Sequence, residues 1–159
     1  MEKDKKEIGK LLQTAKKSKH PEDYLKVAIQ AKDYADLAYQ AFRKQTKEFM
    51  EYKNLAGNYY YKYAKASDFD YAYNMAMLVF LQADNKKKAR KALKKLNKRG
   101  TKQRLDPIVL EILVDVLNGD HKKVYRKFKK HKFDIDENIE PDIKKLLKYE
   151  KDRDRKKEL

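Results

Sequence analysis

Residues 106–119, with the sequence DPIVLEILVDVLNG, determine the fold class of the chain. Asp106 is a good helix N-cap, and the Pro that follows is tolerated in a first turn, where its missing N–H has no partner. The next ten residues are apolar except for Glu111 and Asp115. Gly119 then stands where a residue with left-handed backbone often ends a helix. The stretch therefore predicts a mostly buried α-helix over 107–118.

The same start and stop signals occur on both sides of this stretch. Pro21 and Pro141 stand where helices could begin, Ser67 or Asp68 is expected to cap another helix, and Gly100 to end one. Between these signals apolar residues recur at helical spacing, and the alternating pattern of strands is absent. Eight helices are predicted, over about 3–18, 21–42, 45–65, 68–83, 86–98, 107–118, 120–131 and from 141 onward.

Short connections between helices of similar length favour antiparallel neighbours. We therefore expect an all-α protein, an antiparallel array of about seven or eight helices that forms an α-solenoid or an irregular bundle. One helical domain is expected over 1–149, with its basic portion at 85–132. The charged residues 150–159 are expected to be a helix end or a tail.

Three predicted turns share a local pattern. In each turn an Asp is followed by Tyr, Phe or His and then by residues spaced for packing on one face of a helix; the Asp residues are Asp23, Asp68 and Asp120. The stretch 54–60, NLAGNYY, precedes the second of these turns. The pattern resembles the helix-to-helix turn of tetratricopeptide repeats, and the array is similar in style to the irregular solenoids of SNAP-type adaptors. Corresponding positions are 45 and 52 residues apart, against about 34 in that repeat. The resemblance implies a right-handed α-solenoid that mediates protein–protein interaction.

The positive charge is concentrated in one part of the chain. Of 41 Lys and Arg and 25 Asp and Glu, a formal net charge of +16, residues 85–132 hold 18 basic and 4 acidic side chains. The helix at 86–98 contains no acidic residue, although solvated helices usually mix signs because like charges at i and i+4 destabilise them. If successive helices alternate between two layers, the helices at 86–98 and 120–131 are neighbours in the same layer. Their basic faces are then expected to merge into one surface, with Lys102 and Arg104 at its edge. The candidate polyanion-binding residues are Lys86, Lys87, Arg90, Lys91, Lys94, Lys95, Lys98, Arg99, Lys122, Lys123, Arg126, Lys127 and Lys130.

Two functions fit this charge. The first is a non-catalytic helical-repeat adaptor whose basic face binds an acidic protein partner. The alternative is a sequence-tolerant RNA- or DNA-binding protein that contacts the phosphate backbone, since 7 Arg beside 34 Lys argue against bidentate reading of bases. A Lys-rich composition alone explains many of the lysines, but not their lack of acidic partners.

A cluster of tyrosines supplies candidates for a peptide groove. Helical periodicity is expected to bury Tyr59 and Tyr63 in the core. Tyr60 and Tyr61 cannot both share that face, so one of them is the better candidate to anchor a bound peptide.

No cofactor, metal or catalytic site is expected. The chain has no Cys, and His121 and His131 lie among lysines, which disfavours a ligand role. Glu111 and Asp115 are expected to form a solvent strip or to neutralise a Lys of a flanking helix rather than to act as an acid–base pair. The longest apolar run, 75–81, is too short to span a bilayer, so we expect no membrane insertion and a cytoplasmic location. The sequence predicts no particular oligomeric state.

Overall fold

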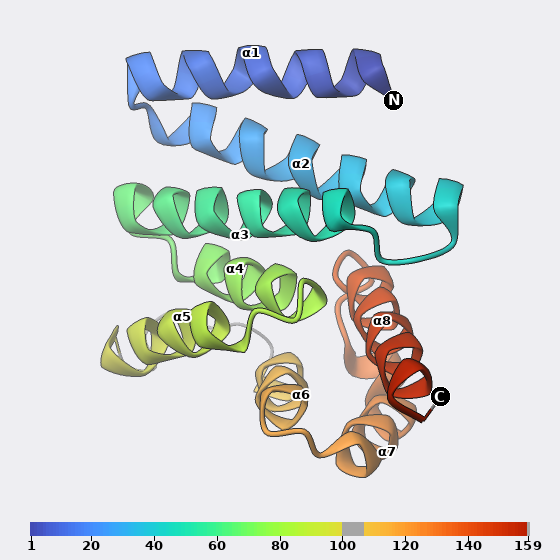
Figure 1. Cartoon of the computed structure of the whole chain (residues 1–159). Coiled ribbons are helices and arrows are strands. Elements are labelled where there is room, and N and C mark those ends of the chain that lie inside the picture. Colours follow the sequence, from blue (N-terminus) through green and yellow to red (C-terminus); the bar gives the residue numbers. More distant parts are fainter. Residues whose placement is uncertain (100–106, 159) are drawn as a thin grey trace. The chain divides into compact units, whose positions relative to one another are not determined.

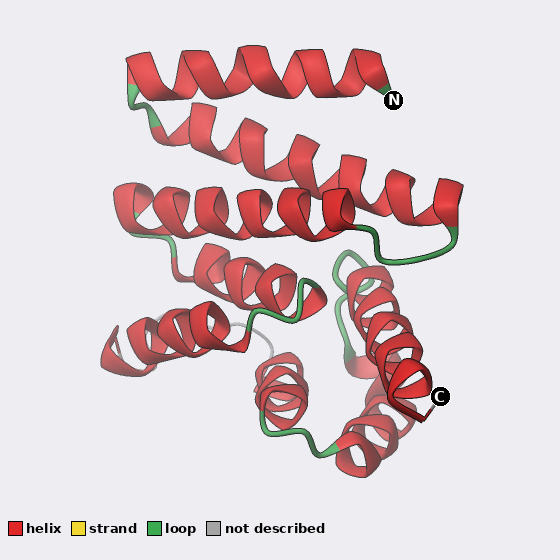
Figure 2. Ribbon diagram, viewed as in Figure 1, coloured by secondary structure: helices red, strands yellow, loops and turns green. Residues whose placement is uncertain are grey.

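The computed structural model describes residues 1–99 and 107–158. The chain divides into two compact units, Met1–Gln103 and Arg104–Leu159, and each is described by itself. Every helix or strand element in the described ranges is a helix, which confirms the all-α fold class (Figure 2). The single domain expected over 1–149 stays a prediction.

The first unit is a stack of five helices in which each helix packs against the next (Figure 1). Successive helices run in opposite directions, as the short connections predicted. The fourth helix of the stack is buried on nearly every side because the third and the fifth helices both cover it. The helices are α1 (Glu2–Ser18), α2 (Pro21–Phe42), α3 (Lys47–Ser67), α4 (Asp70–Gln82) and α5 (Lys86–Arg99).

The turn between α3 and α4 differs from the sequence prediction, in which Ser67 or Asp68 caps the helix that follows. Ser67 is the last residue of α3, and its hydroxyl donates a hydrogen bond back to the Tyr63 carbonyl at 2.5 Å. Asp68 ends α3 in the left-handed region, with φ 55°, which a short polar side chain tolerates. Phe69 occupies the N-cap position of α4 without a side-chain hydrogen bond. Neither Ser67 nor Asp68 caps α4, so that prediction was wrong.

The three Asp residues of the repeat-like pattern have three different local roles. Asp23 lies in the first turn of α2 and accepts a hydrogen bond from the Ser18 hydroxyl at 2.5 Å, whereas Asp68 ends α3. Asp120 precedes a helix of the second unit and accepts the backbone N–H of Lys123 at 3.3 Å. One sequence pattern thus corresponds to three geometries, and membership of the tetratricopeptide-like superfamily stays a prediction.

Close contact between α3 and α4 depends on Gly57. A Cβ atom at this position would lie between 2.4 and 2.8 Å from three carbons of the Phe80 ring. Because Phe80 is only 2% exposed, the added methyl group would displace a ring that is packed within the fold. Glycine here has a packing role, since its φ is not in the left-handed region.

Replacing Gly57 by Ala should lower the free energy of unfolding by about 1–3 kcal/mol, because overpacking outweighs the ~1 kcal/mol that Ala gains in helix propensity. Urea unfolding followed by circular dichroism measures the change. Gly9→Ala is the matched control: apart from its chain neighbours and the backbone of its own helix, no atom lies within 4 Å of its added Cβ, so that variant should be more stable than the wild type. Equal stability of the two variants would contradict this account.

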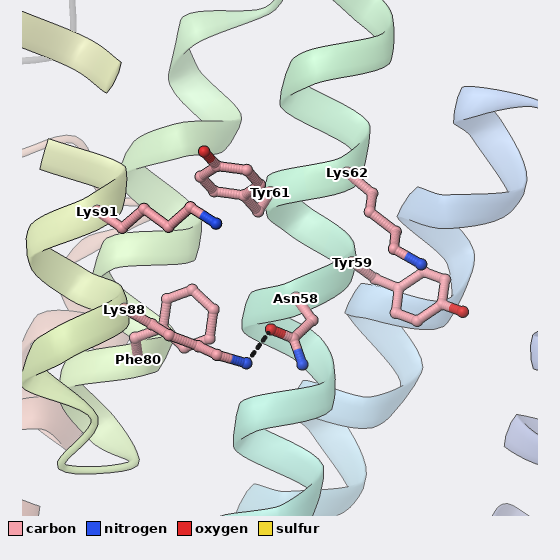
Figure 3. Close-up of a pocket in the computed structure, with 7 residues that line it drawn as sticks. All are labelled: Asn58, Tyr59, Tyr61, Lys62, Phe80, Lys88 and Lys91. Atoms are coloured by element: carbon pink, nitrogen blue, oxygen red, sulfur yellow. Dashed lines mark hydrogen bonds between the residues drawn. The ribbon is translucent and has the colours of Figure 1, made fainter. Parts of the chain in front are cut away.

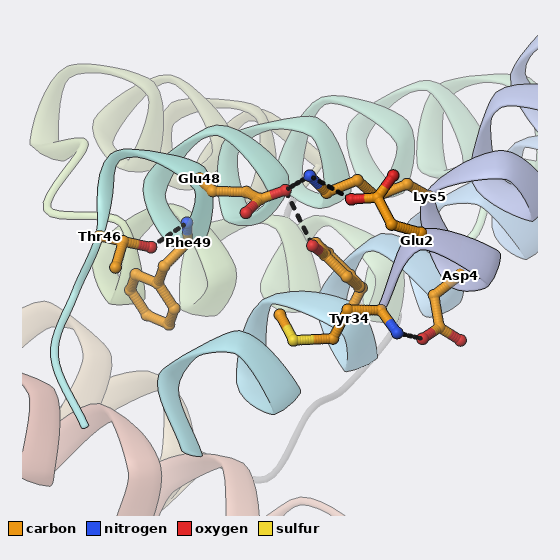
Figure 4. A network of polar contacts seen from close by, with 8 residues as sticks. Glu2, Asp4, Lys5, Tyr34, Thr46, Glu48 and Phe49 are labelled. Carbon is orange, nitrogen blue, oxygen red and sulfur yellow. Dashed lines mark hydrogen bonds and ion pairs between the residues drawn. The ribbon is translucent and has the colours of Figure 1, made fainter. Parts of the chain in front are cut away.

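A polar network joins the first three helices (Figure 4). The Tyr34 hydroxyl donates to the Glu48 carboxylate at 2.8 Å, and Lys5 forms an ion pair with the same carboxylate. The hydrogen bond from Lys5 holds the pKa of Glu48 below its ordinary value of 4.5, while burial raises the pKa of Tyr34 to about 12. Thr46 begins α3 beside this network by accepting the Phe49 N–H at 3.1 Å.

Because the pKa of Glu48 is lower in the folded state, its charged form stabilises the fold above the ordinary value of 4.5. That contribution is lost as the pH falls through the folded-state pKa. Glu48→Gln should therefore lower the free energy of unfolding by about 1 kcal/mol at neutral pH, and the difference from the wild type should shrink in acid. Urea unfolding of both proteins across this range measures the difference. A difference independent of pH would contradict the prediction.

The second unit contains α6 (Pro107–Leu117), α7 (His121–His131), the short 3-10 helix η1 (Lys132–Asp134) and α8 (Glu140–Glu158). α6 packs against α7, and Gly119, with φ 76°, stands after α6 as predicted. α8 continues to Glu158, so the charged residues after position 149 extend a helix. The predicted roles of Gly100, Lys102, Arg104 and Asp106 lie outside the described residues.

Candidate functional site

Helix α5 presents its lysines to solvent because its small residues face the core. Ala89 and Ala92 are fully buried, and Leu93 and Leu96 are half-buried. Asn85 precedes the helix, and its side-chain oxygen accepts the Lys88 N–H at 3.2 Å. An Ala-based inner face lets α5 lie close to α4 and leaves the long side chains outside.

Five exposed cations on one side of α5 form what we call the basic face: Lys87, Arg90, Lys91, Lys94 and Lys98. Within the described part of the first unit, no carboxylate forms an ion pair with any of these five residues. The predicted candidates Lys86 and Lys95, on the same helix, are half-buried. The structure therefore brings most of the α5 candidates to one solvent-exposed helix without compensating acids.

Arg99 differs from the other candidates of α5. Its Nε lies 2.5 Å from Asp70 Oδ1, and its guanidinium also pairs with Asp68. Asp70 is 4% exposed, so this contact fastens the end of α5 to the α3–α4 turn. Arg99 is thus engaged within the fold.

The basic candidates of α7 belong to the second unit. Lys122, Lys123, Arg126 and Lys130 are exposed, whereas Lys127 lies 2.8 Å from Asp115 and 3.5 Å from Glu111. The hydrogen bond with Asp115 raises the pKa of Lys127. This confirms the expectation that the two α6 carboxylates neutralise a Lys of a flanking helix. Because α5 and α7 lie in different units, a merged basic surface stays a prediction.

A pocket of about 390 Å³ opens beside the basic face (Figure 3). Of the two tyrosine candidates, Tyr61 lines it, whereas Tyr60 is 5% exposed and therefore unsuited to anchor a peptide. Tyr60 is buried because α3 packs against both α2 and α4. The buried part of the α3 surface is therefore wider than the single apolar stripe that helical periodicity predicts. The lining residues come from three helices: Asn58, Tyr59, Tyr61, Lys62, Phe80, Lys88 and Lys91.

Three lysines of this pocket lie over three different aromatic rings. The Nζ atoms of Lys62, Lys88 and Lys91 are 4.7, 5.7 and 5.3 Å from the ring centroids of Tyr59, Phe80 and Tyr61 respectively. Lys88 also donates a hydrogen bond to the Asn58 side-chain oxygen at 2.8 Å (Figure 3). None of the seven lining residues is acidic. The pocket therefore combines an aromatic floor with a cationic rim.

Lys62 and Lys88 are pocket residues that were not among the sequence candidates. Lys88 stands three residues before Lys91 on α5, a spacing that places both on one helix face. Lys62 lies on α3, and no local signal associates it with α5. The contact between the helices brings it to the rim.

Another unpredicted feature is a fully buried lysine. Lys53 Nζ lies 2.6 Å from Asp36 Oδ1 and 2.7 Å from Gln82 Oε1, which ties α2, α3 and α4 together. The spacing of Lys53 from Phe49 and Gly57 places it on the inner face of α3, the signal that could have identified it. Its role is structural, since it lies away from solvent.

His121 lies in a small polar cluster that its sequence neighbours did not indicate. Ligand atoms of His121, Glu150 and Asp154 lie within 4.8 Å of one another, an arrangement that could hold a metal ion. The His121 Nε2 and Asp154 Oδ2 atoms are 3.6 Å apart, a polar contact that does not require a metal ion. His131 similarly lies 3.4 Å from Asp134.

No family model, curated protein or solved structure matches the chain. In the described ranges, none of the helices has the length and apolar character needed to cross a bilayer.

Proposed function

We propose that the protein is a non-catalytic, cytoplasmic helical-repeat adaptor that binds an acidic protein segment on the basic face of α5. The observation that carries the proposal is the exposure of Lys87, Arg90, Lys91 and Lys94 on one helix, without acidic partners in the described part of their unit. Like charges at this spacing destabilise a helix. A bound acidic segment removes that repulsion and gains attraction from several ammonium groups at once.

The side-chain chemistry favours a protein segment as the partner. Flexible lysines act as separate point charges and suit carboxylates spaced along a chain, whereas bidentate recognition of bases favours arginine. Arg99 is occupied by Asp68 and Asp70. The remaining face is therefore built mainly from Lys.

Titration of a fluorescent poly-glutamate peptide at low and moderate salt tests this function. Binding is expected at low salt and should weaken steeply as salt screens the exposed charges. The control ligand is a poly-glutamine peptide of equal length, which should not bind. Absence of poly-glutamate binding at low salt would overturn the proposal.

Nucleic-acid binding is the second candidate, and α7 and the short helix η1 that follows it provide its specific support. Tyr125 of α7 is 46% exposed and Phe133 of η1 is 97% exposed, and lysines precede both residues in the sequence. Aromatic rings beside cations are the elements that stack bases and neutralise phosphates in single-stranded nucleic acids. A labelled oligonucleotide in the same titration should then bind more tightly than poly-glutamate and lose affinity in Phe133→Ser. This candidate is excluded if the oligonucleotide binds more weakly than poly-glutamate and if Phe133→Ser leaves its affinity unchanged.

A further inference from the structure

We infer that the pocket between α3, α4 and α5 receives an aromatic side chain of the bound acidic segment. This inference rests on the proposed function and specifies the partner: a segment in which Asp or Glu residues flank a Phe or Tyr. Its basis is the combination of an aromatic floor and an acid-free cationic rim in one cavity.

The floor is apolar and held in place by the fold. Tyr59 and Phe80 are 5% and 2% exposed, and the Phe80 ring is confined against Gly57. Tyr61 forms the third wall and is itself supported by an edge-to-face contact with Tyr73, with ring centroids 5.3 Å apart. A cavity of about 390 Å³ with such walls has room for a large side chain and suits an aromatic ring, which gains from ring–ring contact.

The rim supplies charge complementarity for the residues on either side of that ring. Lys62, Lys88 and Lys91 stand at the cavity without a carboxylate among the lining residues. Lys88 is already oriented by its hydrogen bond to Asn58, at 2.8 Å. Carboxylates that flank an inserted ring would meet these ammonium groups at the mouth of the cavity.

The spacing of the lysines favours this occupant over a single phosphate. Each ammonium lies over a different ring, at 4.7, 5.7 and 5.3 Å from the three centroids. The three ammonium groups thus lie over Tyr59, Phe80 and Tyr61 respectively, and Figure 3 shows their ends apart from one another. Separate carboxylates on a peptide match that distribution.

The test compares two labelled peptides of alternating Glu and Gly that differ at one central residue, Phe or Ser. Their affinities are measured by fluorescence anisotropy for the full chain and for two charge-reversed variants. Lys91→Glu changes the pocket rim, and Lys94→Glu makes the same charge change on the same helix outside the pocket. Both lysines are exposed, so both variants should fold.

The Phe peptide should bind about tenfold more tightly than the Ser peptide, as expected for burying one aromatic side chain. Lys91→Glu should remove most of that preference, whereas Lys94→Glu should weaken both peptides equally. Equal affinities of the two peptides for the wild type, or equal loss of preference in both variants, overturn the pocket inference and leave the proposed function standing. Failure of both peptides to bind at low salt overturns both.

Discussion

Replacing Lys53 by Met should lower the free energy of unfolding by about 3 kcal/mol, the lower end of the cost of breaking a buried ion pair, because Lys32 Nζ lies 4.0 Å from Asp36 Oδ2 and compensates part of the Asp36 charge. Lys53 is fully buried, and its Nζ lies 2.6 Å from the Asp36 carboxylate and 2.7 Å from Gln82. Met preserves much of the side-chain volume, so the effect reports the charge rather than a cavity. Urea unfolding of the purified variant measures it.

Two controls separate the buried charge from other effects of the substitution. Lys62→Met removes a Lys from an exposed position of the same helix and should lower the stability by no more than about 1 kcal/mol, the scale of its exposed cation–π contact with Tyr59. The double variant Lys53→Met, Asp36→Leu removes both charges and should recover much of the lost stability. If Lys53→Met is no more destabilising than Lys62→Met, the buried pair does not stabilise the stack.

Reversing three charges on the basic face should weaken binding of the acidic peptide by about 100-fold at low salt, because like charges across an interface repel. The variant carries Lys87→Glu, Arg90→Glu and Lys94→Glu. All three side chains are exposed and have no ion-pair partner in the described part of their unit, so the fold should tolerate the changes. The measurement is the same anisotropy titration with poly-glutamate.

A matched variant on α7 shows whether position or net charge governs this binding. Lys122→Glu, Arg126→Glu and Lys130→Glu alter the formal charge equally, at exposed positions of the second unit. The proposed function predicts a much smaller loss for this variant. Equal losses would mean that the peptide responds to the net charge of +16 rather than to α5.

The helices could be predicted because their signals are local. Pro21 and Pro107 stand at the first positions of α2 and α6, and Gly119 follows the end of α6. The ends of α1 and α2 lack such a signal, since Lys19 and Arg43 adopt left-handed backbone without being glycine. Such ends are set by the packing of the flanking helices as well as by local sequence.

The candidate site could be predicted only in part, because side-chain partners come from distant positions. The basic face of α5 follows from its own sequence. The engagement of Arg99 by Asp70 and of Lys127 by Asp115, however, depends on how neighbouring helices pack. The burial of Tyr60 and the position of Lys62 on the pocket rim have the same cause.

Amide chemical-shift mapping with the Phe-containing acidic peptide tests the central claim most directly. The claim is that an acidic segment binds α5 and the adjoining pocket. The account predicts that perturbed amides cluster in α5 and in Asn58, Tyr59, Tyr61 and Lys62, which line the pocket from α3. Perturbations confined to α7 and Phe133, or spread evenly over the lysines of both units, would contradict it.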